Sequence, residues 1–242
     1  MRKKILILGA QSPIARATAA EFARQGASLY LADTNSEEIS RIASDLWIRM
    51  NAFVRYGSFD ASEYEEHPAF FASVVEEMDG IDGVVVALDE RGSHNEAVER
   101  FLEAKRIIEI NYLGIVSVLT AAANYLSEER KGFIIGVTSG AGDRTNLGNY
   151  LYGSAKNAFA HFLDGLRKRL RNRDVRVITV KLKTDIAEEA QLKIQITPQG
   201  IGKTIALSLF RKPDIIVLPS FWPFFMAIVQ RILEKMWEYI KR

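Results

Sequence analysis

The chain has 242 residues, of which 48% are hydrophobic, and its formal net charge is +2. This length suits a single α/β domain with a large core. The sequence contains no cysteine, which excludes a disulfide framework and thiol chemistry. Acidic and basic residues are interspersed rather than gathered into a basic stripe, so we expect no nucleic-acid partner.

The first residues, Met-Arg-Lys-Lys, resemble the charged start of a signal peptide. The apolar run that follows them extends only to Gly9, whereas the core of a signal peptide needs ~7–15 apolar residues. We therefore interpret this run as the first strand and expect a cytoplasmic protein.

Apolar runs alternate with helical patterns along the chain, which is typical of a parallel sheet with crossover helices. We expect strands at residues 4–8, 28–32, 52–56, 83–87, 133–138, 175–181 and 215–218. We expect helices at residues 36–50, 69–78, 96–126 (broken near Asn111) and 149–171. The predicted fold is a single Rossmann-type domain over residues 1–242, with a doubly wound parallel sheet of about seven strands flanked by helices.

The first predicted strand runs into the turn Gly9-Ala10-Gln11-Ser12-Pro13-Ile14-Ala15, and a helical pattern follows as far as Phe22. A helix that begins in such a turn presents backbone N–H groups and the positive end of its dipole to a phosphate. Pro13 fits the first helical position after Ser12 as N-cap, although it removes one phosphate donor. The segment favours nucleotide binding over a plain strand-to-helix turn.

Asp33 ends the second predicted strand, at the distance past Gly9 where a carboxylate accepts hydrogen bonds from the adenosine ribose. The same charge would repel a 2′-phosphate, and neither Gln11 nor Ser12 offers a cation to that group. We therefore expect NAD rather than NADP, with NADP left open. The alternative is a turn-forming aspartate before Thr34-Asn35.

Tyr152 and Lys156 have the spacing Tyr-x-x-x-Lys, which places both side chains on one face of a helix. We expect the nearby ammonium to lower the pKa of the phenol toward neutral pH. Ser139 closes the predicted strand at residues 133–138, so its hydroxyl would face the crevice where open α/β sheets bind ligands. These three residues predict a proton-transfer site.

With these motifs the chain resembles the short-chain dehydrogenase/reductase family, in its classical branch, over nearly its whole length. Asn111 in Ile110-Asn111-Tyr112-Leu113-Gly114 matches the active-site asparagine of that family, and Asp60 in Phe59-Asp60-Ala61 matches the aspartate that holds the adenine ring. The catalytic residues that the resemblance implies are Asn111, Ser139, Tyr152 and Lys156. The expected cofactor-binding residues are Gly9, Gln11, Ser12, Ile14, Asp33, Asp60, Ala61, Ala87, Tyr152, Lys156 and Thr184.

The resemblance implies an NAD(P)(H)-dependent oxidoreductase that interconverts a secondary alcohol and a ketone, with a small molecule as substrate. Tyr152 would be the general acid and base, Ser139 would stabilise the substrate oxygen, and Lys156 would also hold the nicotinamide ribose. Asn111 would position a water that restores the proton. The resemblance further implies a homodimer or homotetramer. The three histidines lack the spacing of a metal site, so we expect no metal.

Two segments depart from the family pattern. The chain has Val86-Ala87-Leu88-Asp89 where the family has Asn-Asn-Ala-Gly, and Leu182-Lys183 where the family has Pro-Gly. An alternative hypothesis is therefore a non-catalytic NAD(P)-binding sensor or scaffold on the same fold. An isomerase of the extended branch fits less well, because too little chain follows Lys156 for a separate substrate domain.

Residues 219–242 form an amphipathic and aromatic C-terminal extension with a helical pattern. Pro219, Pro223 and Arg231 interrupt its apolar stretch well short of the ~20 residues that span a bilayer. Residues 221–242 can make peripheral contact with the inner face of the membrane, or pack against a second subunit or the substrate pocket. The segment Ala141-Gly142-Asp143-Arg144 and this tail resemble bacterial reductases that act on a keto-sugar linked to a polyprenyl phosphate.

Overall fold

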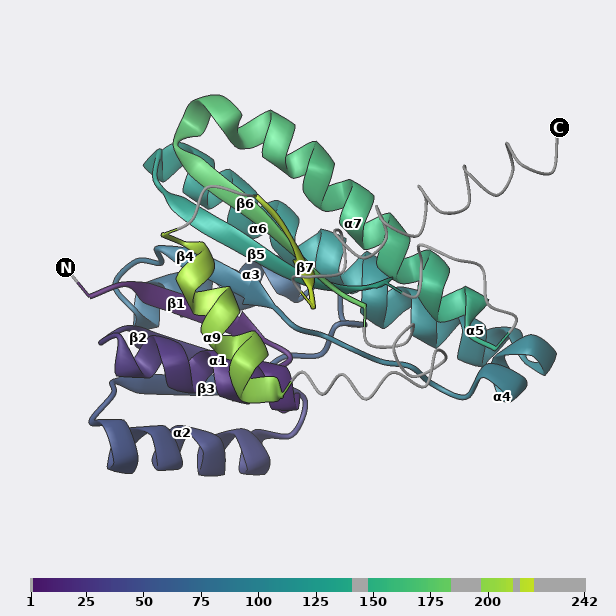
Figure 1. Cartoon of the computed structure of the whole chain (residues 1–242), viewed down its shortest axis with the longest axis horizontal. Helices are drawn as coiled ribbons and strands as arrows, with labels where there is room; N and C mark the ends of the chain where they lie inside the picture. The colour runs from purple at the N-terminus through teal and green to yellow at the C-terminus, as the bar shows by residue number, and fades with distance from the viewer. Residues whose placement is uncertain (1, 141–147, 184–196, 211–213, 220–242) are drawn as a thin grey trace, which may run out of the picture.

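The computed structural model describes residues 2–140, 148–183, 197–210 and 214–219, which form a parallel sheet between two layers of helices (Figure 1). The strands are β1 (Lys4–Leu8), β2 (Ser28–Asp33), β3 (Val54–Ser58), β4 (Gly83–Val86), β5 (Gly132–Ser139), β6 (Val175–Leu182) and β7 (Ile215–Leu218). They pair in the order β3-β2-β1-β4-β5-β6-β7. The predicted Rossmann-type sheet of seven parallel strands is confirmed.

The helices cover the connections between these strands. They are α1 (Pro13–Arg24), α2 (Ser36–Met50), α3 (His67–Glu77), α4 (His94–Glu99), α5 (Phe101–Ile108), α6 (Gly114–Glu129), α7 (Tyr150–Leu170) and α9 (Pro198–Ser208). A π-helical turn, η1 (Glu109–Leu113), joins α5 to α6, and a 3₁₀ turn, η3 (Arg171–Arg173), follows α7. The helix expected at residues 96–126 is interrupted at Arg100, where the backbone is extended, and not near Asn111, where the π turn continues the helix from α5 into α6. Helix α9 is one that the sequence analysis did not predict.

Successive residues of a strand point to opposite faces of the sheet, and here both faces are covered. Ile5 and Ile7 pack with residues of α1, α2 and α9. Leu6 and Leu8 pack with residues of α3, α6 and α7. All four side chains are fully buried, which explains why the central strands are apolar at every position rather than at alternate ones.

From β1 the strands follow one another toward one edge of the sheet as far as β3, and from β4 they follow toward the other edge. Strands β1 and β4 are hydrogen-bonded neighbours, so the strand order reverses between them. Gly9 follows β1 directly with a φ of +78°, and a Cβ at this position would lie 2.7 Å from backbone atoms of Ala87 and Leu88. The turn after β1 and the loop after β4 are therefore in contact at the switch point, where α/β sheets bind their ligands.

The helical run Phe101–Glu129 is long and apolar enough to cross a membrane by length and composition. In the fold, α6 buries Ile115, Leu119 and Ala122 in the cluster beneath α3 and α7. Packing in the core accounts for the apolar character of this helix.

Helix α6 packs closely against Ala61 at Gly114. A Cβ at this position would lie 1.9 Å from the carbonyl oxygen of Ala61. Overpacking of this kind costs about 1–3 kcal/mol. We expect Gly114→Ala to lower the Tm in thermal unfolding by roughly 2–4 °C per kcal/mol lost.

The matched control is Gly165→Ala in α7, where a Cβ would have nothing within 4 Å. This change should raise the stability, because glycine inside a helix is roughly 0.5–1 kcal/mol less favourable than alanine. Equal Tm values for the two variants would contradict the close packing of Ala61 on α6.

Candidate active site

Tyr152 and Lys156 lie one turn apart on α7, facing the carboxyl end of the sheet. Their side chains are nearly inaccessible, with exposed fractions of 5% and 1%. The Nζ of Lys156 donates to the carbonyl oxygen of Leu88 at 2.5 Å and lies 5.5 Å from the centre of the Tyr152 ring. The phenol and the ammonium therefore share one pocket, as the spacing predicts.

A third side chain, Asp89, joins this pair from the loop after β4. Its Oδ1 accepts a hydrogen bond from the Tyr152 hydroxyl at 2.6 Å and lies 3.1 Å from Nζ of Lys156. Arg91 lies over the Tyr152 ring at 5.6 Å. Sequence reasoning missed Asp89 as a site residue, although the departure from the family pattern at this segment marked its position.

Ser139 ends β5 and lines the same pocket of about 150 Å³ as Tyr152 and Lys156. Ile14 and Ala87, which were predicted as cofactor-binding residues, also line it. The structure thus brings three of the four predicted catalytic residues together at one cavity.

The electrostatics of the phenol differ from the sequence-based expectation. Burial, and then the charge and hydrogen bond of Asp89, raise the pKa of Tyr152 above its usual range, while Arg91 and the Ser139 hydrogen bond act in the opposite direction. The prediction that Lys156 lowers the Tyr152 pKa is therefore wrong for this structure. The main reason is the burial of the phenol, and the Asp89 carboxylate, which contacts both the phenol and the ammonium, adds to the effect.

The other two members of the cluster are shifted as well. Burial alone would raise the pKa of the Asp89 carboxyl, but Lys156, Tyr152 and Arg91 together hold that pKa below its usual value. Burial lowers the pKa of Lys156, and the nearby Asp89 carboxylate opposes this shift. At neutral pH the arrangement is a neutral phenol that donates to an ionised carboxylate.

Asn111, the fourth predicted catalytic residue, is fully buried in the π turn η1. Its Nδ2 donates to the carbonyl oxygens of Glu90 at 2.6 Å and Ile107 at 2.8 Å, and its Oδ1 accepts from the Glu90 backbone N–H at 3.2 Å. The expected role was to position a water. That role stays a prediction. The structure shows that Asn111 fixes the loop that presents Asp89, and π turns often occur at such functional positions.

The turn after β1 leads into α1 with the predicted N-cap. The Oγ of Ser12 accepts from the backbone N–H of Ala15 at 3.0 Å and caps α1, with Pro13 at the first helical position. Asp33 braces the turn, since its Oδ2 accepts from the backbone N–H of Gln11 at 3.0 Å. A cleft of about 450 Å³ extends from this turn past Asp33.

Asp60 and Ala61 line the far part of that cleft, beyond β3. Hydrogen bonds from the side chain and backbone of Ser62 lower the pKa of the Asp60 carboxyl, with the two donors 2.6 and 2.8 Å from Oδ1. The predicted cofactor-binding residue Thr184, the segment 141–144 and the tail from residue 220 lie outside the described residues.

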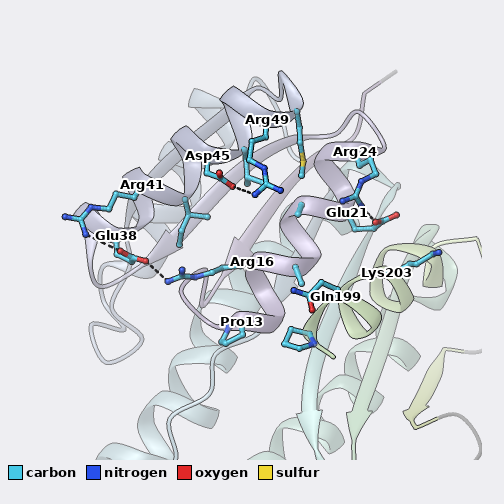
Figure 2. A pocket seen from close by; sticks show the side chains of 16 residues that line it. Pro13, Arg16, Glu21, Arg24, Glu38, Arg41, Asp45, Arg49, Gln199 and Lys203 are labelled. Carbon is cyan, nitrogen blue, oxygen red and sulfur yellow. Dashed lines mark hydrogen bonds and ion pairs between the residues drawn. The ribbon is translucent and has the colours of Figure 1, made fainter. Parts of the chain in front are cut away.

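A separate groove of about 800 Å³ lies between α1, α2 and α9, and Figure 2 shows the arginines that line it. These arginines pair with acidic neighbours, namely Arg16 with Glu38, Arg24 with Glu21, Arg41 with Glu37 and Glu38, and Arg49 with Asp45. Because their charges are offset, the groove gives no indication of an anion site.

Residues 3–193 match the model of the short chain dehydrogenase family. The chain belongs to this family. An uncharacterized oxidoreductase of Streptomyces coelicolor is 29% identical over 222 residues, which cover 90% of this chain and 88% of that protein. The NADP-dependent 3-hydroxy acid dehydrogenase of Schizosaccharomyces pombe is 25% identical, with 89% of this chain and 90% of that protein covered.

The crystal structure of NAD⁺-bound xylitol dehydrogenase has the same fold, with a TM-score of 0.76 at 19% identity. The match covers 89% of this chain and 97% of that one. Membership of the family makes the chain a short-chain dehydrogenase/reductase enzyme.

Proposed function

We propose that this enzyme interconverts a secondary alcohol and a ketone with NAD(H), using Tyr152 as general acid and base. The observation that carries the proposal is the placement of Ser139, Tyr152 and Lys156 around one pocket that adjoins the nucleotide cleft. If the protein were a non-catalytic sensor or scaffold, these three residues would lie together without taking part in a reaction.

The two cavities fit one elongated dinucleotide. Ser12, Ala87, Leu88 and Asp89 line both of them, so a ligand can extend from the turn after β1 to Tyr152 without leaving the protein surface. Gly9, Gln11 and Ser12 would lie along the pyrophosphate, and Asp33 would meet the adenosine ribose. When bound, reduced nicotinamide supplies the hydride that the carbonyl carbon accepts.

The residues of the pocket then manage the proton. In ketone reduction Tyr152 gives its proton to the carbonyl oxygen, and the Ser139 hydroxyl donates a hydrogen bond to that oxygen as negative charge develops on it. The phenolate that remains regains a proton from solvent. In alcohol oxidation the same phenol must begin as the phenolate and take the proton from the alcohol.

Tyr152→Phe removes the transferable proton while keeping the ring. We expect ketone-dependent NADH oxidation to fall by at least ~100-fold, the usual contribution of general acid–base catalysis, with the Kd for NADH nearly unchanged in a fluorescence titration. Retained turnover would refute the assignment. If wild-type protein binds NADH but oxidises it with none of a panel of ketones and keto-sugars, the sensor is the better hypothesis.

We further propose a preference for NAD. Asp33 would present a carboxylate to a 2′-phosphate. The guanidinium of Arg16 is held by Glu38 at 2.6 Å and by the Gln11 carbonyl at 3.0 Å. Asp33→Asn should reduce the NADH-over-NADPH ratio of kcat/KM on the order of tenfold, equivalent to about 1.4 kcal/mol. The surface change Asp45→Asn is the control, and equal ratios in both variants would contradict the role of Asp33.

For the substrate we propose a lipid-linked or sugar ketone, supported by the aromatic composition of residues 219–242. This extension would contact the inner face of the membrane or cover the pocket. Deleting residues from Phe221 onward should reduce liposome binding, or turnover of a long-chain ketone, more than turnover of a small soluble ketone. Unchanged behaviour in both assays would leave the extension a structural element only.

We also propose a homodimer or homotetramer in the cytoplasm. Exposed apolar side chains on α5 and η1 support this assembly, since Phe101, Leu102 and Leu113 have exposed fractions of 76%, 77% and 44%. Apolar groups gathered on the surface of one helical segment are typical of a subunit interface.

A further inference from the structure

The loop after β4 reaches the Tyr152–Lys156 pair through three of its residues. Leu88 offers a carbonyl oxygen to Lys156 at 2.5 Å. Asp89 accepts from Tyr152 at 2.6 Å and lies 3.1 Å from the ammonium. Arg91 lies 4.0 Å from the second carboxylate oxygen of Asp89. One carboxylate oxygen thus meets both the phenol and the ammonium.

This loop is held in place from the side away from the pocket. Asn111 makes three hydrogen bonds, two of them to the Glu90 backbone. The Glu90 side chain accepts from the backbone N–H of Gly92 at 2.9 Å and pairs with Arg106 at 3.2 Å. Asp89 therefore occupies its position because its backbone is fixed, and its side chain remains 42% exposed to whatever binds in the pocket.

Asp89 faces a small set of charged and titratable groups among the described residues. Tyr152 and Lys156 face it from α7, and Arg91 faces it from its own loop. Ser139 approaches from β5 and hydrogen-bonds the phenol. The carboxylate offsets the charge of Lys156 and accepts a hydrogen bond from the phenol, so it favours the protonated phenol.

We propose that Asp89 is a positioning residue of the reaction: its carboxylate bridges Tyr152 and Lys156, keeps the phenol a proton donor for ketone reduction, and sets the pH at which alcohol oxidation begins. This inference rests on the proposed function of Tyr152. It assigns a chemical use to the segment at which the sequence departs from its family, where a glycine would offer no such group.

The first experiment is a pH titration of the cofactor-free protein labelled with ¹³Cζ-tyrosine, in which the Tyr152 resonance is identified by its loss in Tyr152→Phe. In the wild type we expect Tyr152 to ionise above the ordinary tyrosine pKa of about 10. In Asp89→Asn, which keeps the shape and removes the charge, its ionisation should move down by at least one pH unit. Glu96→Gln, a surface change in α4 that removes one negative charge, should leave it in place.

The second experiment measures kcat/KM against pH for alcohol oxidation. The rising limb should move to lower pH in Asp89→Asn by about the same amount and stay unchanged in Glu96→Gln. Tyr152 titrations that coincide in wild type and Asp89→Asn would overturn the proposal. The proposal would also be overturned if Asp89→Asn left the pH profile of kcat/KM unchanged and bound NADH more tightly. Asp89 would then do no more than occupy space that the cofactor needs.

These outcomes separate the two hypotheses. If the wild type turns over no substrate, the proposed function fails, whereas the NMR titration still decides what Asp89 does to the phenol. Folding of Asp89→Asn is checked by its Tm, and Asp89→Ala repeats the titration with the hydrogen-bond acceptor removed altogether.

Discussion

The rest of the candidate site depends on the hydrogen bonds between the Asn111 side chain and the backbone of Glu90. Both hydrogens of its amide nitrogen donate to carbonyl groups, and its oxygen accepts from the Glu90 N–H. A buried amide in this position is satisfied only while the loop stays where it is. That loop in turn places the Leu88 carbonyl and the Asp89 carboxylate on Lys156, so a residue in the π turn determines the surroundings of two residues on α7.

Lys156 explains why the loop carries an acid. A lysine whose side chain is almost completely buried needs a counter-charge, because an isolated ammonium in a protein interior is strongly destabilised. The carbonyl of Leu88 supplies a dipole, but Asp89 supplies the charge. Ribose hydroxyls of a bound dinucleotide are neutral and cannot replace it. The same carboxylate that stabilises the ammonium also keeps the phenol protonated, so the stability of Lys156 and the acidity of Tyr152 are linked.

The sequence predicts those parts of the molecule that depend on local pattern. Strand β1 has the predicted bounds, since a covered strand is apolar almost throughout. Strand β7 also has the predicted bounds, because it is a short apolar run, although it is only partly buried. Helix α9 was not predicted because Gly200 and Gly202 weaken its helical pattern. The need for glycine at position 202 becomes clear only in the fold, where α9 packs closely against α1 at this residue. The contact between Asp89 and Tyr152 spans 63 residues, and no spacing rule indicates such a pair.

The altered segment after β4 bears on whether the site is active. Gly9 lies close to the backbone of Ala87 and Leu88, and β4 pairs in parallel with β1 in the predicted sheet, so the altered residues leave the fold in place. A site released from catalysis would have no use for a buried lysine, which is costly to keep. Here the substituted segment instead provides the acid that makes this lysine tolerable and touches the phenol directly. The departure from the family pattern is therefore better explained as an adjustment of the proton chemistry than as its loss.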